Sequence, residues 1–404
     1  MYPSFVHAGP NLRQTVSTPI LDRMAPLPPP MSAWKNSSTI LTAIWIMVGI
    51  GLILWRPSVG LLRSWMFEHL ARMSPDLPLG PRVILIVGVF LLCGVASVTI
   101  HELGHVLAGL AAGFRFESLV VGPLRLDRRF RVSLHGIPVA FRAGWADLYP
   151  VRTARPQLRV VAMVLAGPAA NFLTASVVYL SPLFAMPYWL VFVVVSVLEG
   201  LLDLMPYRSR TSPSDGWVIW KALTNRPWAE RCLALMQLRA ENKQGVMPES
   251  LSAHPLAAAV AYQDDSEDTI YAHAFAYSAA FHQHKDSEAA AALEVCLRYS
   301  GSAPPALRQA LISDAAVFQG RRRRQPDLAR QWLASLPNSL NTWLRWRAEA
   351  AICEAQQDYA GALTRLEACE KAIQAWPSPA RESVMRTLTR WQSELRAQVE
   401  ERDL

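Results

Sequence analysis

The first half of the chain contains four long apolar segments, separated by short polar or arginine-rich stretches. They run over residues 39–55, 83–112, 160–180 and 183–205. About 20 apolar residues in a helix are enough to cross the hydrocarbon core of a bilayer. This pattern predicts about four transmembrane helices, and therefore a polytopic membrane protein rather than one large soluble core.

A different pattern fills residues 113–150, between the second and third apolar segments. Apolar and polar residues alternate there in short pieces, as over 129–134, and the turn residues Gly122, Pro123 and Gly136 interrupt them. Alternation with a period of two, bounded by turn residues, is typical of strands. We predict one or two β-hairpins close to the membrane surface, because strand edges with unpaired backbone groups cannot face lipid.

The chain becomes polar and helical in pattern from about residue 229. A faint repeat starts at Lys285, Gln325 and Asp358, each followed by alanine at +4, leucine at +8 and an apolar residue at +11. The repeated positions are Ala289, Leu293 and Cys296; Ala329, Leu333 and Leu336; and Ala362, Leu366 and Cys369. They resemble the second helix of tetratricopeptide repeats, although an irregular helical bundle produces a similar pattern.

The predicted fold class is therefore an all-α polytopic membrane protein with a small membrane-proximal β-hairpin element and a C-terminal α-helical, tetratricopeptide-like soluble domain. Residues 1–36 form a proline-rich leader that we expect to be disordered, in which Met24 and Met31 are alternative start positions. The predicted domains after the leader are the first transmembrane helix with an interfacial connection (37–82), a transmembrane core (83–225) and the helical domain (226–404).

Charge and cysteine usage indicate how the chain is oriented. The net charge is +8, and arginines crowd the stretch between the second and third apolar segments and follow the fourth. By the positive-inside rule, residues 113–158 and everything after 206 are cytoplasmic. In a membrane protein this excess is a topology signal, so we expect no nucleic-acid partner. The five cysteines are widely spaced and form no C-x-x-C pair, which indicates neither a disulfide framework nor a cysteine metal site.

The strongest chemical signal is His101-Glu102-Leu103-Gly104-His105, at the end of the second apolar segment. Residues four apart lie on one face of a helix, so the two imidazoles can bind one divalent zinc ion, Zn2+. Glu102 then lies beside the water that the metal activates. A catalytic zinc keeps three protein ligands, so a third ligand must come from elsewhere in the fold.

Three acidic residues are candidates for that third ligand: Glu199, Asp203 and Asp215. Glu199 and Asp203 lie four apart in the last apolar segment, where a charged group is expensive and usually functional. Asp215 is followed by Gly216, and its alternative role is to cap a helix that starts near Trp217. The residues alone leave the choice open.

The third apolar segment contains one more polar group, in the sequence Ala166-Gly-Pro-Ala-Ala-Asn171. Counting along the helices from the flanking arginines, Asn171 and His101 both lie roughly 20 Å inward and can therefore meet. An asparagine there could hydrogen-bond a substrate carbonyl or an oxyanion. The alternative is a buried hydrogen bond between packed helices.

Together, the motifs at 101–105, 166–171 and 215–216 resemble the site-2 protease family of intramembrane zinc metalloproteases, peptidase family M50, over residues 83–225. The resemblance implies zinc bound by His101, His105 and Asp215, with Glu102 as the general base and Asn171 at the family's polar position. One departure is an arginine-rich insert between Pro206 and Ser214. Because of it, Asp215 must fold back toward the metal, and Asp203 is the substitute ligand otherwise.

The predicted function is an intramembrane zinc endopeptidase that cleaves in or near transmembrane segments of membrane-protein substrates, as in regulated intramembrane proteolysis. The strand-forming loop would hold an unwound substrate by strand addition. A transmembrane protein or peptide and the lipid bilayer are the expected partners, with a further protein on the C-terminal domain. The expected location is the bacterial cytoplasmic membrane, with that domain cytoplasmic. The alternatives are a non-catalytic membrane adaptor and a maturation or export factor for a secreted peptide.

Overall fold

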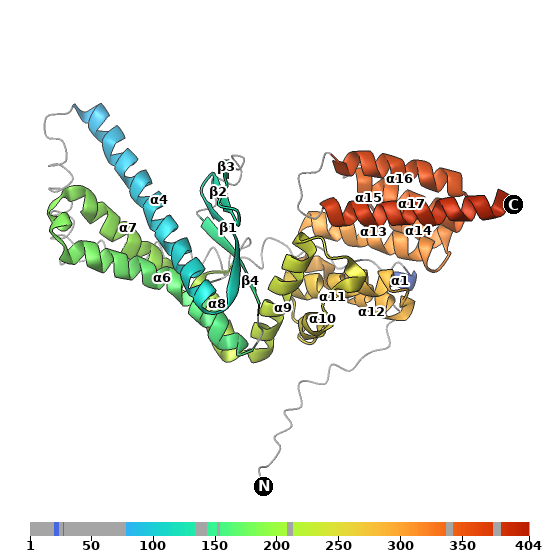
Figure 1. Cartoon of the computed structure of the whole chain (residues 1–404), viewed down its shortest axis with the longest axis horizontal. Helices are drawn as coiled ribbons and strands as arrows, with labels where there is room; N and C mark the ends of the chain where they lie inside the picture. The colour runs from blue at the N-terminus through green and yellow to red at the C-terminus, as the bar shows by residue number, and fades with distance from the viewer. Residues whose placement is uncertain are drawn as a thin grey trace, which may run out of the picture. The chain divides into compact units, whose positions relative to one another are not determined.

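The computed structural model describes residues 20–23, 27, 78–134, 144–151, 154–207, 213–336, 342–374 and 381–403 (Figure 1). The chain divides into two compact units. The membrane unit comprises residues 31–244 and 251–263, and the helical unit comprises residues 1–30, 245–250 and 264–404. The predicted first transmembrane segment, 39–55, and most of the predicted leader lie outside the described residues.

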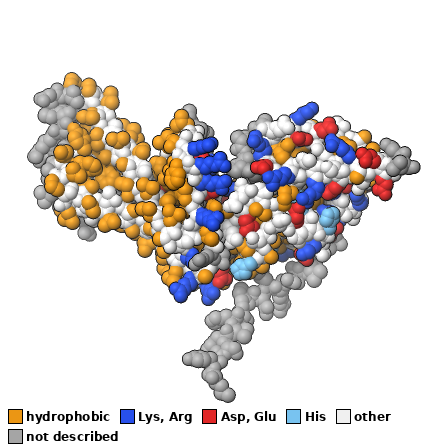
Figure 2. All heavy atoms as spheres, in the orientation of Figure 1, with side chains coloured by type: hydrophobic (Ala, Val, Ile, Leu, Met, Phe, Trp, Pro, Cys, Tyr) orange, Lys and Arg blue, Asp and Glu red, His pale blue; other side chains and the backbone are white. Residues whose placement is uncertain are grey.

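The membrane unit begins with α4 (Leu79–Ala111), a helix that is apolar on all sides. Its large side chains are open to the surroundings: Ile84, Leu91 and Leu92 are 74%, 66% and 73% exposed. Such a surface is unfavourable in water and favourable in lipid. Among the described helices, Ile84–Ala111 and Pro156–Leu180 are long and apolar enough to cross a membrane. Figure 2 shows hydrophobic side chains gathered over this part of the chain.

Two further helices follow the sheet in sequence and pack against α4. They are α6 (Pro156–Leu180) and α7 (Pro187–Leu204), joined by the 3₁₀ turn η2 (Pro182–Ala185). Small residues let α4 and α6 approach closely, since a Cβ placed on Gly104 would lie 2.8 Å from the Cβ of Ala170. The predicted third and fourth apolar segments are therefore helices, while the count of four crossings stays a prediction.

The stretch predicted to form hairpins folds into an antiparallel sheet. Its strands are β1 (Phe114–Val121), β2 (Leu124–Asp127), β3 (Val132–Leu134) and β4 (Gly144–Pro150), in the order β3-β2-β1-β4. The prediction of β-structure here is confirmed. The sequence did not predict that the last strand returns to pair with the first, with Gly144 opposite Val121.

Three helices complete the membrane unit: α8 (Asp215–Thr224), α9 (Arg226–Lys243) and α10 (Ala253–Val260). An apolar cluster joins α8 and α9 to α6 and to the sheet; its buried members are Phe114, Leu148, Val160, Val164, Ala222, Trp228, Ala229 and Leu233. The compact unit thus extends beyond residue 225 to include α9 and α10, while the predicted domain boundary at 225 stays a prediction. Burial of Trp228 and Leu233 against the sheet is the physical reason.

The helical unit consists mainly of consecutive helices that pack on their sequence neighbours, together with α1, which packs on α12. They are α1 (Ile20–Arg23), η3 (Pro248–Ser250), α11 (Glu267–His282), α12 (Asp286–Tyr299), η4 (Ser300–Ser302), α13 (Pro305–Arg321), α14 (Pro326–Ala334), α15 (Thr342–Ala355), α16 (Tyr359–Gln374) and α17 (Arg381–Asp403). The predicted repeat alanines, Ala289, Ala329 and Ala362, are fully buried in α12, α14 and α16. The likeness to tetratricopeptide repeats stays a prediction.

Candidate metal centre

The C-terminal part of α4 presents His101, Glu102 and His105 to the interior of the membrane unit. His101 and Glu102 are only 5% and 7% exposed. The two imidazoles lie edge to face, with ring centroids 4.7 Å apart, as the spacing of four on one helix requires. The sequence motif therefore forms a buried pair of nitrogen donors rather than a pattern on the outer surface.

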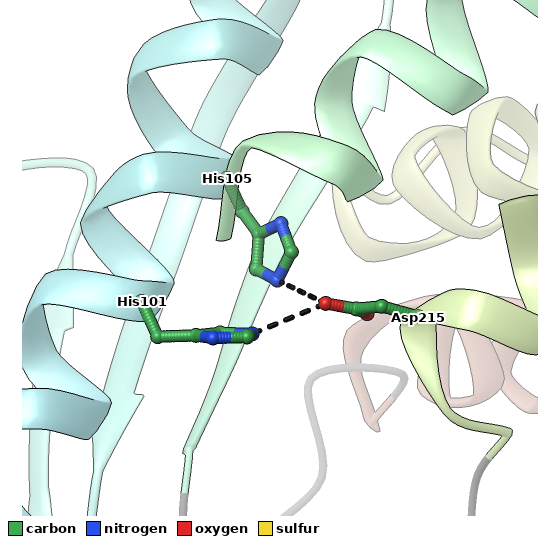
Figure 3. A group of neighbouring side chains, drawn as sticks. All are labelled: His101, His105 and Asp215. Carbon is green, nitrogen blue, oxygen red and sulfur yellow. Dashed lines mark hydrogen bonds and ion pairs between the residues drawn. The ribbon is translucent and has the colours of Figure 1, made fainter. Parts of the chain in front are cut away.

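The third donor comes from the start of α8 (Figure 3). One carboxylate oxygen of Asp215, Oδ2, lies 3.1 Å from Nε2 of His101 and 3.2 Å from Nε2 of His105. Two ligands of a tetrahedral zinc, each about 2.0–2.1 Å from the ion, lie about 3.3 Å apart. The distances from this oxygen to the two nitrogens therefore match those between ligands of one metal ion.

Local structure explains how Asp215 reaches the histidines after the arginine-rich insert. Ser214 caps α8, since its Oγ accepts a hydrogen bond from the backbone N–H of Trp217. The capping role that we considered for Asp215 is thus filled by its neighbour, and the carboxylate is free to face the imidazoles. Gly216 lies directly against the backbone of Leu204 at the end of α7, where a Cβ would not fit. This close approach sets the position of Asp215.

The outer nitrogens of both rings have polar neighbours. Nδ1 of His105 lies 2.9 Å from the carbonyl oxygen of Met163 and can donate to it, which would leave the lone pair of Nε2 for a bound metal ion. Nδ1 of His101 lies 3.3 Å from Nδ2 of Asn171. Oδ1 of the fully buried Asn171 has no hydrogen-bond partner among the described residues. A half-turn of the amide would give the N–H of a metal-bound His101 an acceptor.

These donors fit zinc by their chemistry as well as by their spacing. Two neutral imidazoles and one carboxylate are a common ligand set for a catalytic zinc. Burial tends to raise the pKa of Asp215, but hydrogen bonding to both histidines outweighs it and lowers the pKa below its ordinary range. The carboxylate is thus ionised and ready to bind a cation.

A second acidic group lies next to the same site, on α7. His101, Glu199 and Asp203 also bring their donor atoms within 4.8 Å of one another. Oδ2 of Asp203 is 3.7 Å from Nε2 of His101, farther than Asp215 is from either histidine. Glu199 accepts a short hydrogen bond from Ser97 instead. The geometry therefore favours Asp215 over both alternatives as the third ligand.

Glu102 faces the first residue of β4. A Cβ placed on Gly144 would lie 2.7 Å from Oε1 of Glu102 and 2.7 Å from a methyl group of Val98. The end of this strand therefore runs directly past the carboxylate. The sequence analysis predicted strands in this region but did not place one of them beside the catalytic candidate.

Other residues of the site carried little or no signal in the sequence. The Met163 contact uses a backbone carbonyl, which no side-chain motif can reveal. A Cβ placed on Gly167 of α6 would lie 2.5 Å from Nε2 of His105 and 2.7 Å from Nε2 of His101. The sequence analysis considered Asn171 of the motif at 166–171 and assigned no role in the site to Gly167.

Comparison with known proteins agrees with this geometry. The family model described as peptidase family M50 matches residues 89–375, well over half of the chain. No curated protein and no solved structure gives a significant match. Members of that family are membrane proteases of the site-2 type and zinc metallopeptidases. The matched range includes both histidines and the aspartate of the site, and the chain belongs to peptidase family M50.

Proposed function

We propose that this chain is an intramembrane zinc endopeptidase that cleaves peptide bonds in or near transmembrane segments of other proteins. The observation that carries the proposal is that Asp215 of α8 meets His101 and His105, which lie in a helix apolar enough to cross a membrane. A protease whose histidines lie in such a helix meets its substrate within the bilayer or at its edge.

The roles of the residues follow from their positions. His101, His105 and Asp215 would hold the metal, which supplies a Lewis acid that polarises a peptide carbonyl and acidifies water. Glu102 takes the proton from the attacking water as general base and delivers it to the leaving amine. Its near-complete burial excludes bulk water from this proton transfer.

Asn171 has a positioning role in this proposal. Its amide lies against the outer nitrogen of His101, and it is completely buried. Partners at the outer nitrogen fix the tautomer and orientation of a metal-binding histidine. This position favours orientation of His101 over the direct contact with substrate that the sequence led us to consider.

The strand β4 offers a way to hold the substrate. A helical peptide hides its carbonyls, so the scissile segment must unwind before hydrolysis. β4 is an end strand of the described sheet, and its first residue abuts Glu102. Pairing of an unwound substrate segment with this strand would carry a peptide bond toward the general base.

We also propose four membrane crossings with the helical unit in the cytoplasm of a bacterial cell. The support is an argument from parity. Residues 20–23 pack within the same compact unit as the C-terminal helices, so both lie on one side of the membrane. That requires an even number of crossings between them. The helices α4, α6 and α7 supply three, and the predicted segment 39–55 supplies the fourth.

Zinc content of the detergent-purified full chain tests the metal site. We expect about one zinc per chain in the wild type and in Asp203→Ala, and loss in His105→Ala and in Asp215→Ala. Loss in Asp203→Ala with retention in Asp215→Ala would transfer the third ligand to α7. Wild-type protein that neither contains zinc nor takes it up would overturn the proposal.

Cleavage of model transmembrane peptides, followed by mass spectrometry, tests the reaction itself. We expect Glu102→Gln to keep its zinc and lose cleavage, because only the general base is removed. The proposed cytoplasmic helical unit would recruit a protein partner or the substrate. A cellular phenotype that survives Glu102→Gln would favour the adaptor alternative, and a requirement limited to one secreted peptide would favour the maturation factor.

A further inference from the structure

A short piece of the N-terminal region is bound by the helical unit. The residues Ile20–Arg23 form one helical turn, α1, which packs on α12. Leu21 is 1% exposed and belongs to the apolar core of the unit, in one cluster with Phe318 and Trp332. Nearly 300 residues separate the segment from the side chains that enclose it, so this is a tertiary contact rather than a local one.

Both backbone polar groups of Leu21, its N–H and its carbonyl, are hydrogen-bonded to side chains of the helical unit. The carboxylate of Glu294 accepts from the N–H of Ile20 at 3.1 Å and from the N–H of Leu21 at 3.0 Å. The carbonyl of Leu21 accepts from Nε2 of Gln319 at 2.8 Å and from Nε1 of Trp332 at 3.3 Å. Arg323 adds an ion pair with Asp22.

Two of the side chains that make these bonds are buried in the helical unit. Gln319 is 0% exposed and Trp332 is 1% exposed. Both aim an N–H at the same carbonyl, and buried donors of this kind are destabilising when they have no acceptor. Because these groups bind backbone atoms, the site demands little of the sequence beyond an aliphatic residue, a leucine and an aspartate in a row.

We propose that this pocket, formed by Glu294, Gln319, Arg323 and Trp332, is a recognition site for a short linear peptide, and that the chain's own Ile20–Arg23 segment is its exchangeable occupant. A contact of four residues gains little beyond what it loses in chain entropy. The tether to the same chain raises the local concentration of the segment to about millimolar, which keeps the pocket filled in cis. A second peptide with the aliphatic-leucine-aspartate pattern would compete for it.

Binding of a labelled peptide to the full-length protein in detergent tests this. The probe copies residues 17–27, and fluorescence anisotropy measures its affinity for the wild type and for Leu21→Asp, whose own segment no longer fits the apolar pocket. We expect Leu21→Asp to bind the probe at least about tenfold more tightly, because the tethered competitor is removed. Asp22→Asn should give a smaller gain, since it loses only the ion pair with Arg323.

The control is a probe that carries aspartate in place of the leucine, which must bind neither protein. Circular dichroism shows whether the helical unit of Leu21→Asp remains folded. Equal affinity of the probe for both folded proteins, no binding to either, or equal binding of the two probes would overturn the proposal. The segment would then be a permanent part of the core.

Discussion

Replacing Gly167 with alanine tests whether the two imidazoles hold a metal in the arrangement of Figure 3. This glycine lies on α6, opposite the histidine pair of α4. A Cβ placed on it would lie 2.5 Å from Nε2 of His105 and 2.7 Å from Nε2 of His101. Both are the nitrogens that face Asp215, so the added methyl group would occupy space next to the proposed metal ligands themselves.

The size of the effect follows from these distances. Non-bonded carbon and nitrogen atoms settle about 3.5 Å apart, so the His105 ring would have to retreat by about 1 Å. A metal ligand tolerates a deviation of about 0.2 Å. We therefore expect the zinc content to fall from about one per chain to near zero, and cleavage to fall at least about 100-fold. The helix itself should not suffer, since alanine is favoured over glycine within helices by about 1 kcal/mol.

Elemental analysis, peptide cleavage and a thermal melt followed by circular dichroism give the three readouts. Gly94→Ala is the matched control: it lies on α4, and nothing lies within 4 Å of its added Cβ. We expect this control to keep both zinc and activity. A folded Gly167→Ala protein with one zinc per chain and wild-type cleavage would refute the assignment of the metal site.

Three further substitutions test the surroundings of the site and the helical unit. Asn171→Ala should weaken zinc binding about 10- to 100-fold in a chelator competition. Asn171→Asp should keep the zinc, because its carboxylate still offers His101 a hydrogen-bond acceptor. Unchanged zinc affinity in both variants would leave Asn171 only the role of contacting the substrate. Gly216→Ala should push α8 off Leu204 and lose zinc as fully as Asp215→Ala does, with unchanged helix content, and a zinc-replete variant would contradict the close-approach argument. Burial lowers the pKa of His273 from 6.5 to about 4. Between these two pH values the imidazole is therefore protonated in the unfolded chain and neutral in the folded chain. The contribution of His273 to the free energy of unfolding is then fully present above pH 6.5, and up to about 3 kcal/mol of it is lost as the pH falls toward 4. Denaturant titrations should show a smaller loss of unfolding free energy over this pH range for His273→Gln than for the wild type. Parallel pH profiles of the two proteins would contradict this role of His273.

Features that depend on local sequence periodicity were predictable. The apolar segments predicted three of the described helices, α4, α6 and α7. The spacing of His101 and His105 predicted a pair of nitrogen donors on one face of α4. Alternation over residues 113–150 gave strands. The order of those strands was not predictable, because the pairing of β4 with β1 joins segments about 30 residues apart and the alternation says nothing about partners.

The choice of the proposed third metal ligand shows where sequence patterns stop being informative. Glu199, Asp203 and Asp215 are all acidic residues close to the histidines in the fold. What separates them is geometry: the cap at Ser214 and the approach of Gly216 to Leu204. The packing of Ile20–Arg23 on the helical unit was equally unpredictable from the sequence. One helical turn is too short to show a periodicity, and the residues that hydrogen-bond to it begin more than 270 residues later.

The glycines around the site give a physical reason for the motifs that surround the histidines. Gly144 of β4 touches the carboxylate of Glu102, Gly167 of α6 touches both imidazoles, and Gly216 of α8 touches the end of α7. At each of these three positions the glycine backbone itself contacts a side chain of the site or, for Gly216, the end of α7. Side chains at these positions would displace the base, the nitrogen donors or Asp215 in turn. The A-G-P and D-G motifs are therefore as much a condition for the proposed metal site as the proposed ligands, because side chains in place of their glycines would keep α4, α6 and α8 from bringing His101, His105 and Asp215 together.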